Sequence, residues 1–182
     1  MSEMFSRRVF LRGLGVVAAA AALTACSSTN EAVNQALIEG AVGGIVAADC
    51  KIGRSRYWAA NATVPVNEIS FRIVMTNVGS KPVTLSGDNF ATTLDGTPIT
   101  PFRFSARDVG DSDIWRTYDS LTIRPGEERS VALEYEINQS TYDSWYKSSR
   151  TVAVSFTCGN QRVTYTKNSR SDEITVSDIE TL

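Results

Sequence analysis

Two cysteines in the body of the chain are the first residues whose type and spacing suggest chemistry. Cys50 stands in an alternating apolar run that ends at Ile52, and Cys158 ends a similar run that starts at Val152. Because alternate residues of a strand point to one face, both thiols are expected to face the core. The pattern predicts a Cys50–Cys158 disulfide, which on the chain-entropy model would stabilise the fold by about 4–5 kcal/mol. Two separate buried thiols are the alternative.

Carboxylates gather in the segment 107–120. Calcium takes hard oxygen ligands of this kind, but the spacing matches no calcium-binding loop, and Arg107 and Arg116 stand among the acids. We therefore expect a solvated acidic loop and predict no metal ligand. The aspartates concerned are Asp108, Asp111, Asp113 and Asp119.

Aromatic residues stand in a polar connection between two apolar runs: Tyr142, Trp145 and Tyr146. Their spacing suits one helical turn that plugs an end of the core, while aromatics in a polar loop also form binding platforms. Trp115, beside the acidic segment, raises the same question. Tyr57 and Trp58 follow Lys51, Arg54 and Arg56, a pattern that suits a small basic and aromatic patch, although a sandwich rim is the more common explanation.

The composition excludes several classes of function. The 182 residues include no histidine, which removes Ser–His–Asp and Cys–His catalysis and His-ligated zinc. The chain carries 18 Lys and Arg against 20 Asp and Glu, a net charge of -2 that gives no case for nucleic acid. With no phosphate-binding glycine motif either, we predict a protein that is not an enzyme, with no catalytic residue and no cofactor. A hydrolase that uses carboxylates alone is the less favoured alternative.

The first 26 residues resemble the signal of a bacterial lipoprotein exported by the twin-arginine route. Arg7-Arg8 is followed by Phe10-Leu11, a mildly apolar run, and Leu23-Thr24-Ala25-Cys26. The apolar run is shorter than the roughly 20 residues of a spanning helix. The resemblance implies export in the folded state, lipidation of Cys26, and anchoring to the lipid bilayer outside the cytoplasm by acyl chains.

The remaining chain shows strand periodicity. We predict a signal peptide over 1–25, a lipidated tether over 26–43, and one antiparallel β-sandwich over 44–182. Within the tether, 31–42 has helical spacing, and a partly ordered linker is the alternative. Short strands are expected at 46–52, 69–76, 82–86, 90–94, 99–104, 121–123, 131–137, 152–158, 161–166 and 174–176.

Two blocks resemble the immunoglobulin-like domain of bacterial extracellular lipoproteins. Phe71 to Leu94 contains a strand, Asn-x-Gly, and Lys-Pro-Val, and Leu121 to Ile137 contains a Pro-Gly-Glu turn that leads into a core strand. The resemblance covers about 66–156 and implies an immunoglobulin-like sandwich in an extracellular place. It implies no activity.

Together these observations lead to the expectation of a surface-anchored binding module for a protein or envelope component. The aromatic loops are its candidate contact residues. The alternative is a structural or accessory lipoprotein that assembles with a membrane complex through a sheet edge.

Overall fold

The structure is a computed structural model that describes residues 41–58, 63–109 and 114–182. Almost all of its regular elements are strands, as the alternating patterns predict. They are β1 (Ile45–Tyr57), β2 (Val66–Asn77), β3 (Val83–Leu85), β4 (Phe90–Leu94), β5 (Thr97–Ile99), β6 (Arg103–Asp108), β7 (Arg116–Thr117), β8 (Leu121–Ile123), β9 (Glu128–Glu136), β10 (Thr151–Cys158), β11 (Gln161–Asn168), β12 (Ile174–Val176) and β13 (Glu180–Thr181). A 3-10 turn, η1 (Gly87–Asn89), and one short helix, α3 (Gln139–Ser144), complete the described elements.

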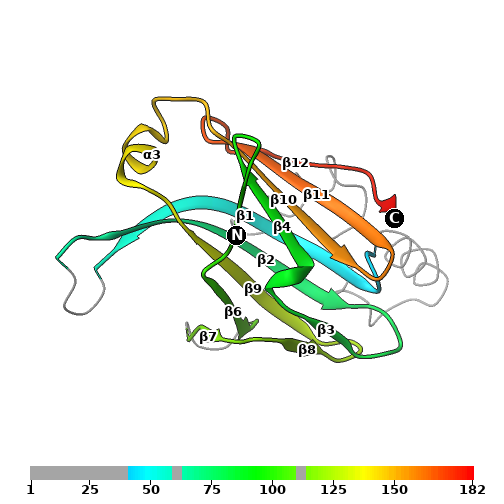
Figure 1. Cartoon of the computed structure of the whole chain (residues 1–182). Coiled ribbons are helices and arrows are strands. Elements are labelled where there is room, and N and C mark those ends of the chain that lie inside the picture. The colour runs from blue at the N-terminus through cyan, green and yellow to red at the C-terminus, as the bar shows by residue number, and fades with distance from the viewer. Residues whose placement is uncertain (1–40, 59–62, 110–113) are drawn as a thin grey trace, which may run out of the picture.

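The described strands form two large antiparallel sheets that pack face to face (Figure 1), and β3 pairs with β8 in a separate two-stranded sheet. The first sheet has the order β1-β2-β9-β6-β7, and the second has the order β12-β11-β10-β4-β5 with β13 also paired to β11. The β1-β2-β9-β6 and β5-β4-β10-β11 orders are those of strands A-B-E-D and C′-C-F-G in immunoglobulin-like sandwiches. The predicted all-β sandwich is confirmed.

The core lies between the two sheets, where every second residue of the central strands is buried. Phe71 on β2, Phe90 on β4, Phe156 on β10 and Tyr165 on β11 form its aromatic centre, with ring centroids 5.1–6.2 Å apart. The hydroxyl of Tyr135 on β9 lies 2.6 Å from Thr92 Oγ1, so this buried polar group is satisfied.

The predicted disulfide is wrong: the thiols of Cys50 and Cys158 are both free. The register of β1 against β2 shifts between Ala48 and Lys51, and Asp49 takes a φ of 47°. This β-bulge breaks the simple alternation on which the predicted pairing relied. Cys158 instead packs against Gly43, which lies just before β1. The contact is so close that a Cβ atom added at Gly43 would lie 2.5 Å from the Cys158 sulfur.

β1 and β2 are longer than the sequence pattern predicts, and they extend beyond the second sheet. In Figure 1 their outer half runs to the left as a two-stranded hairpin, with α3 above it. Arg54 pairs with Ile69 and Arg56 with Asn67, so both arginines are on the face that buries Phe71 further along. The two arginines of the outer hairpin therefore lie on the face of β1 that elsewhere packs in the core, but at a point beyond the end of the core.

The opposite end of the sandwich is held by Asn77, which is fully buried at the end of β2. Its side-chain amide donates to the carbonyls of Lys81 and Ile123 at 2.9 and 2.8 Å, and its Oδ1 accepts from the Gly79 amide. Its own backbone exchanges hydrogen bonds with Gly126 and Glu127. One residue thus joins the turn after β2 to the turn before β9.

Several predictions concern residues that the structure does not describe. The export signal, Cys26, and the tether up to residue 40 lie outside the described residues; Val42 forms a bridge with Ile45. The strand expected at 99–104 is divided between β5 and β6, because Thr100 and Pro101 turn the chain from the second sheet to the first. In the described part, no helix is long and apolar enough to cross a membrane.

Candidate functional site

A cluster of arginine and aromatic side chains lies where the outer hairpin meets α3. We call it the hairpin–helix surface and define it by Arg54, Arg56, Tyr142 and Tyr146, which contact one another, together with Trp58, which directly follows β1. Trp58 and Tyr146 expose 66% and 60% of their surface, among the highest values for large apolar residues in the described part of the chain. Aromatic and arginine side chains in this proportion are typical of the centres of protein interfaces.

Cation–π contacts hold the two arginines against the helix. The Arg54 guanidinium lies 4.2 Å from the Tyr142 ring centroid and 4.7 Å from that of Tyr146. The Arg56 guanidinium lies 4.1 Å from the Tyr142 centroid. Stacking of this kind contributes about 0.5–1 kcal/mol at an exposed site, and it orders two side chains that would otherwise be mobile.

The short helix owes its position to a cap, a plug and a polar chain. Asn138 caps α3 by accepting from the Thr141 amide at 2.7 Å. Trp145, directly after the helix, is 2% exposed and closes the end of the core. Asn67 on β2 donates to Gln139 Oε1 at 3.1 Å, and Gln139 donates to Asp143 at 2.7 Å. Six residues do not make a stable helix alone, so these contacts to the sandwich fix it.

The two arginines differ in how their charges are met. Arg56 lies 3.6 Å from an Asp143 carboxylate oxygen and donates from Nε to Asn67 Oδ1 at 2.7 Å. Arg54 donates to the backbone carbonyl of Tyr142. Within the described part of the chain, no ion pair joins Arg54 to a carboxylate. Its charge is therefore stacked and oriented but not neutralised.

The aromatic loop contains the plug that its spacing allowed, and the binding platform stays a prediction. Trp145 is the plug, while Tyr146 is exposed and Tyr142 is half-buried under the arginines. Trp115 is not part of this cluster. It lies on the outer face of the first sheet, 5.5 Å from the Arg72 guanidinium and 5.1 Å from that of Arg107. Around Arg54 and Arg56, the structure places the tyrosines of α3, a basic and aromatic arrangement that the sequence analysis ranked behind a sandwich rim.

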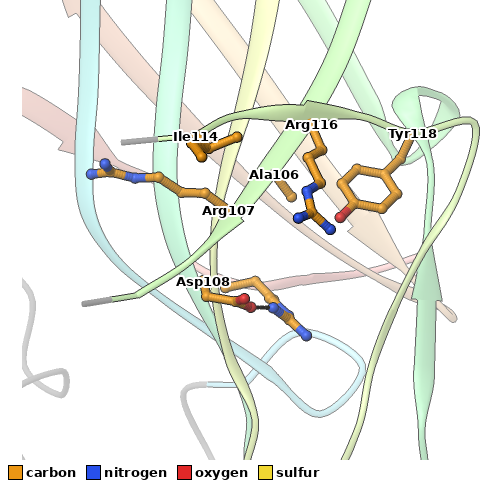
Figure 2. A pocket seen from close by; sticks show the side chains of 7 residues that line it. Ala106, Arg107, Asp108, Ile114, Arg116 and Tyr118 are labelled. Carbon is orange, nitrogen blue, oxygen red and sulfur yellow. Dashed lines mark ion pairs between the residues drawn. The ribbon is translucent and has the colours of Figure 1, made fainter. Parts of the chain in front are cut away.

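The segment predicted as a solvated acidic loop borders a small cationic hollow of about 50 Å³. In Figure 2, Arg116 and Tyr118 lie on one side of it and Arg107 points away on the other. Asp108 pairs with Arg129, which also pairs with Glu127. Asp111 and Asp113 lie outside the described residues, and among the described residues no three acidic or sulfur side chains form a metal site.

Two glutamates on the outer face of the first sheet were missed by the sequence analysis. Glu68 is 5% exposed; its Oε1 accepts from the Ser55 hydroxyl, and its Oε2 has no hydrogen-bond partner. Glu134 accepts from Arg103 at 2.7 Å. Burial raises the pKa of the Glu134 carboxyl, and the nearby Glu68 carboxylate raises it further against the opposing effect of Arg103. Only strand pairing brings these residues together, so no local pattern could have revealed them.

The free cysteines have the properties of packed thiols. Burial raises the pKa of Cys50 to about 12, against a smaller opposing effect of Lys167. Burial also raises the pKa of Cys158. Because the thiolate is the reactive form, neither residue has the electropositive setting of a redox or nucleophilic cysteine.

A wider groove of about 520 Å³ opens between the edges of the two sheets. Its floor is formed by core residues such as Phe90 and Phe104, and its rim includes Pro98, Pro101 and the 44% exposed Phe102. The prolines remove backbone donors from this edge, which protects it from pairing with another strand.

No protein-family model matches the chain, and no curated protein matches its sequence. Among solved structures, it is similar to a candidate lipoprotein (ycdA) of Bacillus subtilis, with a TM-score of 0.41 at 11% identity over 70% of this chain and 36% of that one. An uncharacterised β-sandwich protein of Clostridium difficile gives 0.40 at 16% identity, over 70% of this chain and 91% of that chain. A protein of Archaeoglobus fulgidus gives 0.32 at 13% identity, over 72% and 95%. The chain thus spans about a third of the length of the Bacillus protein.

Proposed function

We propose that the protein is a lipid-anchored, non-enzymatic binding module that holds a protein partner through the hairpin–helix surface. The observation that carries the proposal is the exposed Tyr146 against a stacked arginine, with the exposed Trp58 at the end of the strand that carries both arginines. Ordered side chains lose less conformational entropy on binding than free ones. A preorganised aromatic and arginine cluster is therefore suited to recognition.

The position of the cluster along the chain supports this function. The described chain begins at Ala41. Shortly after it, the Gly43 amide donates to the Gln161 side chain at 2.9 Å, and the Gly44 carbonyl accepts from the Val78 amide. These contacts belong to the Asn77 end of the sandwich. β1 then runs 13 residues, about 40 Å, to the hairpin–helix surface. A module anchored through its N-terminal cysteine would present this surface on the side away from the anchor.

Site-specific photo-crosslinking in the native membrane tests the proposal. A photoreactive amino acid replaces Trp58 or Tyr146 in the full chain, and Leu182 serves as the matched control because it is 58% exposed at the other end of the molecule. We expect one discrete adduct from the first two positions and none from Leu182. Equal adducts from all three positions, or none from any, would contradict the proposal.

Assembly through a sheet edge remains the second candidate. The edge of β1 away from β2 is unpaired within the described residues, and 13 residues is long for an edge strand. The bulge at Asp49 interrupts that edge. This candidate predicts crosslinks along Lys51 to Ser55 to a neighbouring strand, and it can be separated from the first by placing the photoreactive group there.

A further inference from the structure

The chemistry of the partner can be inferred from the difference between Arg54 and Arg56. Arg56 has its carboxylate, Asp143, at 3.6 Å and an amide oxygen of Asn67 at 2.7 Å. Arg54 has the Tyr142 carbonyl and two aromatic rings but no carboxylate among the described residues. The hairpin–helix surface thus contains one arginine whose charge is satisfied from within the chain and one whose charge is not.

The surroundings of Arg54 strengthen any bond to an anion. Its guanidinium is partly covered by Tyr142 and Tyr146, which lowers the local dielectric constant and restricts the group to one orientation. A planar guanidinium in a fixed position suits a carboxylate, which accepts two parallel hydrogen bonds. The exposed ring of Tyr146 contacts Arg54, and the exposed ring of Trp58 directly follows the strand that carries both arginines, so both can offer apolar contact to residues that flank the anion.

We propose that the partner presents an acidic peptide segment whose Asp or Glu carboxylate binds Arg54, while a neighbouring apolar side chain packs on Trp58 and Tyr146. This inference rests on the proposed function and names the chemical class of the partner. Charge complementarity favours it: Asp143 pairs with Arg56, and among the described residues no carboxylate pairs with Arg54. Across such a surface, complementary charge supplies specificity and a faster encounter.

An anionic lipid surface has similar chemistry, but two observations favour the peptide. The hairpin–helix surface lies about 40 Å along β1 from the start of the described chain, on the side away from the proposed anchor. The chain from Cys26 onward also contains more acids than bases, since three of the 18 basic and one of the 20 acidic residues precede it. The body of the molecule is therefore repelled by an anionic membrane.

The test measures binding of a fluorescent hexapeptide of alternating Glu and Leu to the full lipidated chain in zwitterionic detergent micelles. Replacing Arg54 by Gln is expected to weaken binding about tenfold, and Arg54→Lys, which keeps the charge but loses the planar fork, is expected to weaken it less. Arg124→Gln is the matched control, because Arg124 is an exposed arginine at the Asn77 end. It should leave the affinity unchanged.

Two further probes make the result decisive. The same peptide with Gln in place of Glu should bind at least tenfold more weakly, because it carries no carboxylate. Vesicles with 30% phosphatidylglycerol should show no dependence on Arg54. Equal affinity of the Arg54→Gln variant for the acidic peptide, or an Arg54-dependent affinity for the vesicles alone, overturns the inference. If a discrete crosslink from Trp58 persists in the Arg54→Gln variant, the proposed binding function is retained and the inference of an acidic partner is contradicted.

Discussion

β2 carries one buried asparagine near each end, and the two are used in opposite ways. Asn77 is fully buried and bonds to backbone groups: the carbonyls of Lys81 and Ile123 and the amide of Gly79. Asn67 is 6% exposed, and its side chain bonds only to other side chains, those of Arg56 and Gln139. Backbone partners are fixed by the fold, whereas side-chain partners can change rotamer.

The comparison separates a structural end of the molecule from an adaptable one. At the Asn77 end, turns are tied to each other through the backbone. At the Asn67 end, the polar chain through Arg56, Gln139 and Asp143 lies between the hairpin and α3. The same residue type on the same strand thus serves rigidity at one end and, on our proposal, recognition at the other.

The largest expected effect is the loss of Asn77. Replacing it by Ala leaves the buried Ile123 carbonyl and the part-buried Lys81 carbonyl and Gly79 amide without this partner, at about 1 kcal/mol each, so stability should fall by about 3 kcal/mol. Urea denaturation measures the change. Asn160→Ala, at an exposed asparagine in the turn between β10 and β11, is the control and should stay within about 0.5 kcal/mol.

The matching change at the other end sharpens the contrast. Asn67→Ala should cost about 1 kcal/mol in the same assay, because Arg56 and Gln139 are less buried and can turn to water or to Asp143. A loss as large as that of Asn77→Ala would show that both ends are equally structural, and the division drawn above would then fail.

Glu68 lies beside Asn67 on the opposite face of β2, and its effect depends on pH. The pKa of Glu134 is raised in the folded state, so the folded protein binds the proton more tightly than the unfolded one. Stability from this group is complete below the ordinary carboxyl pKa and is lost as pH rises through the raised value.

Replacing Glu68 by Gln removes one cause of that raised pKa and the unpartnered Oε2 charge. The variant should therefore be more stable than the parent near pH 7 by about 1 kcal/mol or less, and the difference should shrink at pH 4. Thermal unfolding of both proteins at the two pH values provides the measurement. A difference that grows on acidification would mean that the two carboxylates do not interact.

The smallest effect on stability is expected at the proposed contact residue. Arg54→Lys should change the free energy of unfolding by no more than about 0.5 kcal/mol, since the lysine side chain keeps a cation beside the tyrosine rings. A loss of several kcal/mol in urea would mean that Arg54 holds α3 in place, and the adaptable end would then be structural as well.

Much of the fold follows from local pattern, because period-two alternation is set by burial on one face of a sheet. The patterns around Phe71, Leu133 and Val154 therefore predict β2, β9 and β10 correctly. The disulfide prediction failed because the bulge at Asp49 depends on how β1 pairs with β2. The alternation of apolar residues in the sequence does not indicate such a bulge. A thiol that alternates with buried residues can still pack against another partner.

The candidate site was predictable only in part. Helical spacing places Tyr142, Trp145 and Tyr146 near one another, but whether a given ring is buried depends on how far the hairpin extends beyond the sandwich. Arg54 and Arg56 continue the core-facing alternation of β1, and only the end of the second sheet makes those positions solvent-accessible. The proximity of Glu68 to Glu134 depends on the register of β2 against β9, which pairs Glu68 with Glu136 and Ser70 with Glu134.

β1 connects the two ends of the molecule as one continuous strand. It begins next to the Asn77 network and ends at the hairpin–helix surface. A pull between a membrane anchor and a bound partner would therefore run along the backbone of β1, with its ladder to β2 stressed in shear, so that many hydrogen bonds share the force. The bulge between Ala48 and Lys51 contains an extra residue, so β1 can lengthen slightly there. Tension would straighten this bulge first, and the sandwich would yield by a small elastic extension before any strand is lost.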